Sequence, residues 1–350
     1  MAEMHALTRI ALVLAAALAG YFAAAVFTDE APVDGPVTVA SRPLDLYTPP
    51  RPERARRTGA LEFLAGLELK SDRPEFGGFS GLAVDTQGTR ILALSDGAFW
   101  LSARLHLEDG LPVSIADARM APLRGPDGPL VAKEDRDAEA LIVVPGGFVV
   151  AFEHHQRLLF YPDTAPWQDI PAVLHEAGEP VQVPAQVLDN PRNGGLEAGV
   201  RLADGRLLLF SEERRAGPGL KRAWLLDPGG HVAALAYAAP KDFGATAAAR
   251  LPEGDILLLL RNFTRVRGVT VLVQRIPAGA IAAGSVLRGE ELARFAPPLT
   301  VDNLEGLAVR RDTSGRTLLY LISDDNFSPL QRTILLVFAL VSDGREMPGP

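Results

Sequence analysis

NLEGL (residues 303–307) and LYLISD (residues 319–324) form the stretch that decides the fold of this chain. The first segment places a glutamate directly before Gly306 and continues as a short apolar strand. A polar turn leads into the second segment, an apolar strand that ends on Asp324. Two apolar runs around a polar turn are typical of a β-hairpin. This hairpin carries an acidic residue at the start of its first strand and another at the end of its second.

Four further copies of this hairpin precede it in the chain. They are GLEA with LLLFSE (residues 195–198 and 207–212), DAEAL with FVVAFE (137–141 and 148–153), FSGL with ILALSD (79–82 and 91–96), and, most weakly, FGAT with ILLLLR (243–246 and 256–261). An alignment on Gly81, Ala140, Ala198, Thr246 and Gly306 gives spacings of 59, 58, 48 and 60 residues. Hairpins repeated at such periods predict a β-propeller with one blade per repeat, whose equivalent positions face a central channel.

Further strand candidates separate the hairpins, at residues 100–107, 157–161, 223–226, 232–237 and 269–276. They bring the repeats toward the four strands of a propeller blade. We expect residues 61–70 and 332–341 to share a blade and close the ring, because an open edge strand invites aggregation. The predicted fold is therefore all-β, a propeller of five or six four-stranded blades. The alanine-rich segment 278–295 predicts one helix on the outside.

The N-terminus is expected to target the chain out of the cytoplasm. Residues 10–27 carry no charge and follow Arg9. This run exceeds a usual signal-peptide core and just reaches the length that spans a bilayer. Both a cleaved signal peptide and a membrane anchor therefore remain open for residues 1–27. Residues 28–58 are rich in proline and predict an extended linker, and the propeller is expected to occupy residues 59–345. The sequence thus predicts a periplasmic or other extracytoplasmic location, with the N-terminal segment as the only contact with membrane.

The composition excludes several classes of partner and site. The net charge is −8 and the pI is about 5.4, so we expect no nucleic-acid partner. The chain has no cysteine, which excludes disulfides, thiolate metal sites and a cysteine nucleophile. No P-loop, dinucleotide fingerprint or Gly-x-Ser-x-Gly elbow is present in the sequence. We expect a monomer.

The repeated acids are the candidate functional residues. Glu139, Glu197 and Glu305 occupy equivalent positions at the start of three first strands, and are expected to enter the channel from three blades. The second strands end on another repeated set, Asp96, Glu153, Glu212 and Asp324. Because clustered carboxylates repel one another at low dielectric, they need a compensating charge. Oxygen donors without cysteine favour Ca²⁺ or Mg²⁺ over Zn²⁺, and Ca²⁺ is the expected cofactor.

Structural roles for the same residues are the alternative. A glutamate before Gly-Leu can accept backbone N–H bonds, and the aspartates can be ordinary turn residues. His154 and His155 suggest a metal site, but adjacent residues on a strand point to opposite faces. Arg332, before the closing strand, suits a phosphate or a carboxylate because its guanidinium is a planar fork. It is equally suited to pairing with a nearby aspartate.

The arrangement resembles the phytase-like family, described as having the esterase-like activity of phytase, over roughly residues 60–341. The resemblance rests on GGFSGL (77–82), DAEAL (137–141), NGGLE (193–197), DNLEGL (302–307), LISDDNF (321–327) and QRT (331–333). It implies a propeller with a phosphoesterase or esterase role. This chain departs from the family pattern at Asp96-Gly97-Ala98, where an Asp-Arg-Gly turn is more usual, and at Ala198, where glycine is commoner.

The first functional hypothesis is a metal-assisted hydrolase of a small anionic ester, either a phosphate or a carboxylate ester. Glu139, Glu197, Glu305 and Asp324 would hold the Ca²⁺. Arg332 would stabilise developing negative charge, and Glu153 or Glu212 would act as general base. The alternatives are a non-catalytic propeller that binds a ligand or partner in the cell envelope, and a lactonase of the gluconolactonase type.

Overall fold

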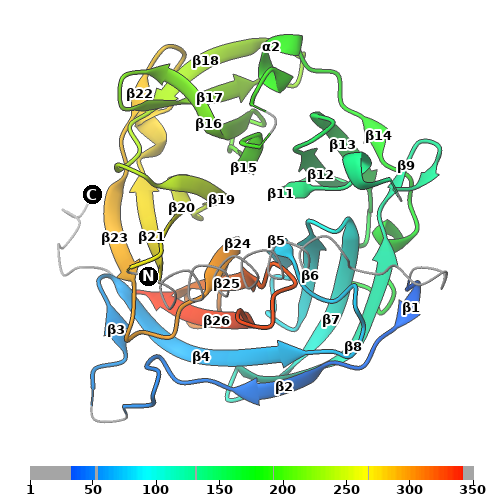
Figure 1. Cartoon of the computed structure of the whole chain (residues 1–350), viewed down its shortest axis with the longest axis vertical. Helices are drawn as coiled ribbons and strands as arrows, with labels where there is room; N and C mark the ends of the chain where they lie inside the picture. Colours follow the sequence, from blue (N-terminus) through cyan, green and yellow to red (C-terminus); the bar gives the residue numbers. More distant parts are fainter. Residues whose placement is uncertain (1–32, 52–53, 131, 192, 267, 342–350) are drawn as a thin grey trace, which may run out of the picture. The chain divides into compact units, whose positions relative to one another are not determined.

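The computed structural model describes residues 33–341, apart from residues 52–53, 131, 192 and 267. From Val33 onward the chain forms one compact unit, which we call the propeller body. Apart from one small two-stranded sheet, its described strands form five sheets that are arranged as blades around a common centre (Figure 1). The predicted all-β propeller is therefore confirmed, and the number of blades is five.

Each of the first three blades adds strands outward from an innermost strand. Blade one contains β5 (Phe79–Val84), β6 (Arg90–Ser95), β7 (Phe99–Glu108), β8 (Leu111–Pro122) and β1 (Gly35–Pro36). Blade two contains β11 (Ala138–Val144), β12 (Gly147–Phe152), β13 (Arg157–Pro162) and β14 (Glu179–Pro180). Blade three contains β15 (Leu196–Arg201), β16 (Leu207–Gly217), β17 (Leu220–Leu226), β18 (Val232–Tyr237) and β22 (Val286–Leu287).

The last two blades complete the ring. Blade four contains β19 (Gly244–Arg250), β20 (Ile256–Thr264), β21 (Gly268–Ile276) and β23 (Glu290–Phe295). Blade five contains β24 (Asn303–Arg311), β25 (Thr317–Asp324), β26 (Thr333–Leu340), β4 (Leu61–Lys70) and β2 (Ala40–Pro43), with β3 (Arg57–Thr58) also paired to β4. The connections contain the small sheet of β9 (Arg124–Gly125) and β10 (Gly128–Pro129), and the short helices α2 (Ala185–Leu188), η1 (Lys133–Asp135), η2 (Ala172–Leu174) and η3 (Ala278–Ala280).

The innermost strands β5, β11, β15, β19 and β24 are neighbours in that order, and β24 returns to β5. Blade five closes the ring as predicted, because β26 pairs antiparallel with both β25 and β4. The second strands read as near-continuous apolar runs, since neighbouring blades cover both of their faces. Residues 257–260, four leucines in β20, are all fully buried.

Aromatic side chains fill the spaces between blades. Trp100 of blade one packs edge-on against Tyr161 of blade two, with ring centroids 5.3 Å apart. Phe295 of blade four packs in the same way against Phe338 of blade five, at 5.2 Å. Large rings at these junctions bury much apolar area and fix the angle between blades.

The predicted outer helix at residues 278–295 is wrong. This segment forms the single turn η3 and then the strands β22 and β23, and β23 pairs with β21 as the outermost strand of blade four. Alanine is the strongest helix former, but intrinsic propensity is a weak preference that tertiary pairing overrides. Gly279, Gly284 and Gly289 interrupt any helix, and Gly284 adopts a φ of 74° that suits glycine.

The structure also differs from the prediction of a linker over residues 28–58, since the propeller body begins at Val33 rather than near residue 59. β2 pairs with β4 as the edge strand of blade five, and Leu46 is fully buried. Proline-rich chain suits this place because proline cannot donate to a ladder and is tolerated at a sheet edge. Among the described residues, no helix is both long and apolar enough to cross a membrane. Residues 1–27 lie outside the described part, so the targeting segment stays a prediction.

Candidate functional site

Each of the five innermost strands carries a β-bulge at the same place. The ladder to the second strand skips one residue in every blade, and a bulge of this kind re-aims the side chain of the extra residue. We call these skipped residues the bulge ring: Ser80, Glu139, Glu197, Thr246 and Glu305. The equivalence corrects the sequence alignment of the fourth repeat by one residue, because Ala247 rather than Thr246 matches Gly81.

Two members of the bulge ring are hydroxyl residues that join neighbouring blades. Ser80 Oγ donates to the carbonyl oxygen of Ala138 in blade two at 2.5 Å. Thr246 Oγ1 donates to the carbonyl oxygen of Leu304 in blade five at 3.3 Å. The other three members are glutamates, whose repulsion across blades contributes to their pKa values, so their side chains converge on the channel.

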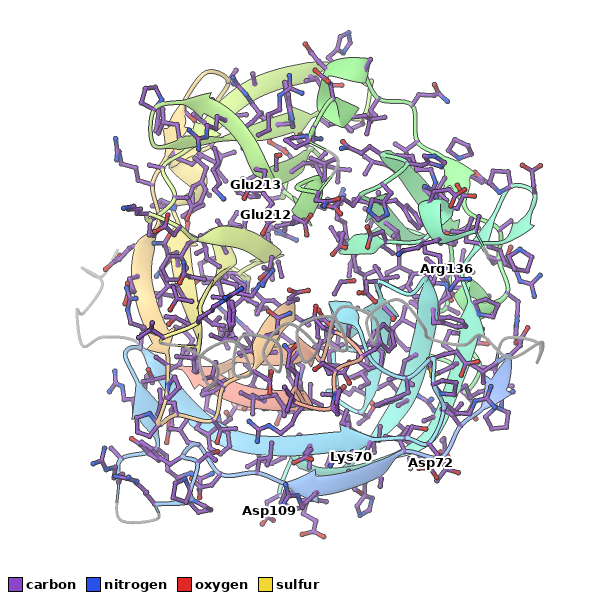
Figure 2. All side chains as sticks on the ribbon, in the orientation of Figure 1. Lys70, Asp72, Asp109, Arg136, Glu212 and Glu213 are labelled. Atoms are coloured by element: carbon purple, nitrogen blue, oxygen red, sulfur yellow. The ribbon has the colours of Figure 1, made fainter. Side chains whose placement is uncertain are left out.

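A second set of polar residues lies next to the bulges, on or just after the second strands, opposite the residue at or just before the start of each innermost strand. We call it the strand-end ring: Asp96, Glu153, Glu212, Arg261 and Asp324. Glu212 lies toward the centre of the propeller, whereas Lys70, Asp72 and Asp109 lie at its outer edge (Figure 2). We refer to the two rings together as the acidic mouth of the channel.

Burial and mutual repulsion hold the bulge glutamates toward their neutral forms. Burial raises the pKa of Glu139 and of Glu197 well above the usual range, and neighbouring carboxylates raise both further. Burial and the charge of Asp324 raise the pKa of Glu305 to about 8, although Arg261 acts in the opposite direction. Glu305 is 9% exposed. Carboxyl groups in such a site stay protonated or need a cation.

The aspartates of the strand-end ring extend the cluster between blades five and one. Asp324 accepts hydrogen bonds from Asn303 Nδ2 at 3.0 Å and from the Asn326 backbone N–H at 2.5 Å. Burial nevertheless raises the pKa of Asp324 to about 6. Burial and then the charge of Asp324 raise the pKa of Asp96, whose Oδ1 atom is buried without a hydrogen-bond partner. Such an unsatisfied oxygen is a candidate cation ligand.

Blade two adds a group of three residues that were not predicted together. Glu153 accepts hydrogen bonds from the backbone N–H groups of Gly194 and Gly195 in blade three. Ligand atoms of Glu153, Asp137 and His154 all lie within 4.8 Å of one another, and His154 Nδ1 lies 3.0 Å from Asp137 Oδ2. Burial and the charge of Asp137 raise the pKa of Glu153. This group can hold a metal ion.

The two histidines diverge, as adjacent residues were expected to. They sit in a turn rather than on a strand, and His155 pairs with Asp135 at 2.9 Å, away from Asp137. His154 alone therefore joins the acidic mouth.

Two arginines are candidates for the residue that stabilises negative charge on a bound anion. Arg332 donates to Asp302 through its backbone N–H at 3.1 Å and its Nε at 3.4 Å, so its guanidinium is engaged outside the rings. Arg261 occupies the fourth position of the strand-end ring, where the other blades carry acids. Its Nε lies 3.3 Å from Glu305 Oε1, and its Nη2 lies 4.0 Å from Glu212 Oε1. Burial raises the pKa of Glu212, while Arg261 lowers it.

The repeated serines are committed to the backbone. Ser95 Oγ donates to Gly77 O at 2.7 Å, Ser211 Oγ to Gly194 O at 3.2 Å, and Ser323 Oγ to Arg332 O at 2.6 Å. With Ser80 also bonded to a carbonyl oxygen, these hydroxyls support the fold rather than present a nucleophile.

Sequence reasoning brought forward the three bulge glutamates and the four acids of the strand-end ring, and it missed Asp137 and Arg261. Asp137 lies two residues before a predicted glutamate, and its role depends on the turn that carries His154. Arg261 lies in the second strand of the weakest repeat, β20, three residues before its end. Its position in that strand is equivalent to the strand-end acids and was a usable signal.

A family model for the phytase-like family, described as "Esterase-like activity of phytase", matches residues 74–327. A search of curated proteins gives no match. Solved structures with a similar fold include a gluconolactonase from Xanthomonas campestris (11% identity, 87% of this chain and 96% of that one, TM-score 0.39) and the β-propeller domain of Cps50 (Swd1) from Myceliophteria thermophila (12%, 88% and 100%, TM-score 0.36). A protein of unknown function from Bacteroides caccae is also similar (11%, 69% and 66%, TM-score 0.29).

None of these structural likenesses bears on the activity of the chain. The family match covers most of the propeller body, including the bulges of all five blades and the whole strand-end ring. The chain therefore belongs to the phytase-like family.

Proposed function

We propose that the propeller body is a hydrolase of small anionic phosphate or carboxylate esters, which works at the acidic mouth with a bound divalent cation. The observation that carries this proposal is the convergence of three bulge glutamates from three different blades. No turn or ladder requires them there, since Ser80 and Thr246 occupy the same bulge in the other two blades. Family membership supports hydrolysis of an ester.

The residues of the acidic mouth fit a hard cation. They offer carboxylate oxygens from several blades, with raised pKa values and one buried oxygen of Asp96 without a partner. Such donor sets suit Ca²⁺ or Mg²⁺. We assign the ligands to Glu139, Glu197, Glu305 and Asp324, with Asp96 beside them. A cation bound there supplies charge neutralisation for the ester and lowers the pKa of a bound water.

The remaining residues of the mouth orient the substrate and move protons. Glu153 is held in place by two backbone N–H groups, and its raised pKa suits a general base. Glu212, also with a raised pKa, is the second candidate for this role. Arg261 faces the rings and takes the part first expected of Arg332, which is to stabilise negative charge that develops on the substrate.

We also propose that the protein works outside the cytoplasm as a monomer. The support is the uncharged run at residues 10–27, which follows Arg9. The net charge of −8 disfavours nucleic acid as a partner.

The test is an ester-hydrolysis assay on the propeller body (residues 33–350), first stripped of metal and then supplied with Ca²⁺ or Mg²⁺. The substrates are 4-nitrophenyl phosphate, 4-nitrophenyl acetate and a δ-lactone, and the last of these separates a lactonase from an esterase. Cation-dependent turnover that Glu197→Gln abolishes supports the proposal. Glu213→Gln is the matched control, because Glu213 is an exposed neighbour of Glu212 on β16. Cation binding without turnover of any substrate would favour a non-catalytic binding propeller instead.

A further inference from the structure

The channel has a second, chemically different end. Past the bulges, the second, third and fourth residues of each innermost strand, counted from the residue after the bulge, surround the channel at this end. They line a cavity of about 250 Å³. The layer nearer the bulges is formed by Leu82, Leu141, Gly199, Ala248 and Leu307. The outer layer is formed by Val84, Val143, Arg201, Arg250 and Val309.

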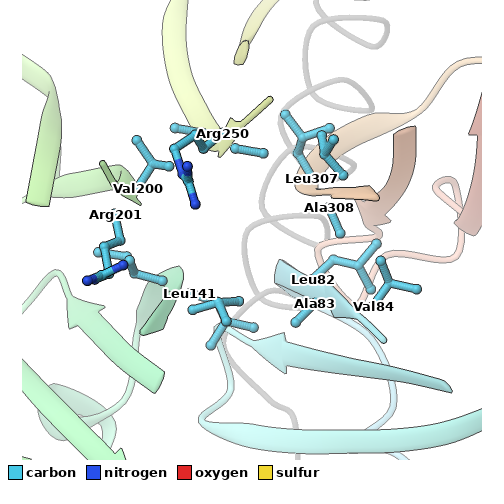
Figure 3. A pocket seen from close by; sticks show the side chains of 15 residues that line it. Leu82, Ala83, Val84, Leu141, Val200, Arg201, Arg250, Leu307 and Ala308 are labelled. Carbon is cyan, nitrogen blue, oxygen red and sulfur yellow. The ribbon is translucent and has the colours of Figure 1, made fainter. Parts of the chain in front are cut away.

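Blades three and four differ from the other three in both layers. They carry Arg201 and Arg250 in the outer layer, and the small residues Gly199 and Ala248 beneath them. The other blades carry valine over leucine. Arg201 and Arg250 consequently lie on one side of the cavity, and apolar residues such as Leu82 and Leu307 lie on the other (Figure 3). The small residues keep long side chains out of the layer beneath the two arginines, and at Gly199 an added Cβ would already lie 2.4 Å from Ile142 Cδ1.

The two arginines have no partner within the described residues. Neither guanidinium group forms an ion pair or a hydrogen bond there, and no acid is among the fifteen residues that line the cavity. Arginines elsewhere in blade four are engaged, since Arg261 contacts Glu305 and Arg275 contacts Asp255 at 2.6 Å. Two unpaired guanidinium groups beside an apolar wall form a receptor for an anion that also has an apolar part.

A narrow neck separates this cavity from the acidic mouth. The space between them is about 10 Å³ and is lined largely by small residues, among them Gly81, Ala140 and Ala198. This is room for about one water molecule. A ligand that enters beside the arginines therefore does not reach the bulge glutamates, and the two ends are independent sites.

We propose that this cavity binds a small organic carboxylate with a compact apolar body. The carboxylate pairs with Arg201 and Arg250, and the apolar body lies over Gly199 and Ala248 against the leucines of the opposite wall. The cavity is smaller than the roughly 300–1,000 Å³ of pockets for drug-sized ligands, so the ligand is correspondingly small. The proposal does not depend on the hydrolase assignment.

The experiment is calorimetric titration of the metal-free propeller body with hexanoate and with benzoate. We expect both to bind, and the double variant Arg201→Gln with Arg250→Gln to lose at least about tenfold in affinity because the charge-assisted bonds are gone. Ala248→Leu keeps both charges and places a long side chain in the layer beneath them, and should weaken binding to a similar extent. Arg104→Gln, an exposed change on β7, removes the same charge outside the cavity and should leave the affinity unchanged.

Three results would overturn the proposal. One is a body that binds neither probe up to about 10 mM, which is weaker than any specific site of this kind. A second is unaltered affinity in the arginine double variant. The third is hexan-1-ol or inorganic phosphate binding as tightly as hexanoate, since the first lacks the carboxylate and the second lacks the apolar body. Melting temperatures of all variants show whether each remains folded.

Discussion

Three blades carry a glutamate at the bulge of the innermost strand, and two carry a hydroxyl residue at the same bulge. In blades one and four the hydroxyl satisfies a carbonyl oxygen of the next blade, and so joins the ring together. In blades two, three and five the same position holds an ionisable group whose pKa burial raises. The bulge is therefore a structural device of the repeat, whereas the glutamates, which we propose to be functional, cost stability unless a cation compensates them.

The largest effect is expected from removing charge in the glutamate blades. Glu197→Gln combined with Glu305→Gln should lower divalent-cation affinity and turnover together, the latter by about 100-fold or more. The same variant should raise the melting temperature of the metal-free body, because it removes two buried carboxyl groups whose raised pKa values cost stability at neutral pH. Calorimetry, hydrolysis rates and thermal denaturation check this. A variant that keeps its turnover would show that the glutamates are structural.

Arg261 and Arg332 are the two candidates for the positive charge that acts on the substrate, and their variants distinguish between them. Arg261→Gln should reduce turnover by about tenfold or more, because Arg261 is the positive charge beside Glu305 and, on our proposal, stabilises negative charge on the substrate. Arg332→Gln should change turnover much less, since Arg332 is engaged with Asp302. Steady-state kinetics on the two variants rank them directly. The reverse order would return the role to Arg332.

The glutamate blades should also make the metal-free body sensitive to pH. In the unfolded chain Glu305 ionises near 4.5, whereas in the folded chain its pKa is about 8. Between these values the folded state binds more protons than the unfolded state, so the free energy of unfolding falls as pH rises. Urea denaturation from pH 4.5 to 8.5 measures this. A saturating divalent cation should cancel the fall at the upper end, and equal slopes with and without cation would contradict the account.

The hydroxyl blades should show the smallest effect, and only in stability. Ser80→Ala should lower the free energy of unfolding by about 1 kcal/mol, since a buried hydrogen bond between blades is lost. Thr246→Val should cost no more than this, because its bond is longer. Neither variant should change cation affinity. A loss of turnover equal to that of Glu197→Gln would mean that all five bulge positions serve the site.

Much of the fold follows from local signals in the sequence. Acidic-glycine starts and apolar second strands located five blades, and the apolar C-terminal strand predicted the closure of blade five with β4. The helix predicted at residues 278–295 was wrong because alanine composition is a weak local preference. Glycine placement and the pairing of β23 with β21 override it. The strands within residues 33–58 were not predicted because an edge strand has no hydrophobic period to detect.

The candidate site could be predicted from the sequence to a similar extent as the fold. Recurrence at one position of the repeat identified Glu139, Glu197 and Glu305, because equivalent residues of a propeller meet at its axis. Arg261 was overlooked because it breaks the acidic pattern that defined the search. His154 and Asp137 depend on the path of one turn, and no spacing rule encodes that path.

The most direct test of the central claim is a Ca²⁺ titration of the metal-free propeller body, followed by its melting temperature and its content of bound metal. The account predicts a saturable rise in melting temperature at micromolar Ca²⁺, because a ligand of the native state stabilises it by mass action. The rise should be absent in the Glu197→Gln, Glu305→Gln variant. No rise in the unmodified body, with Mg²⁺ and other divalent ions equally without effect, would contradict the account and make the acids of the channel structural.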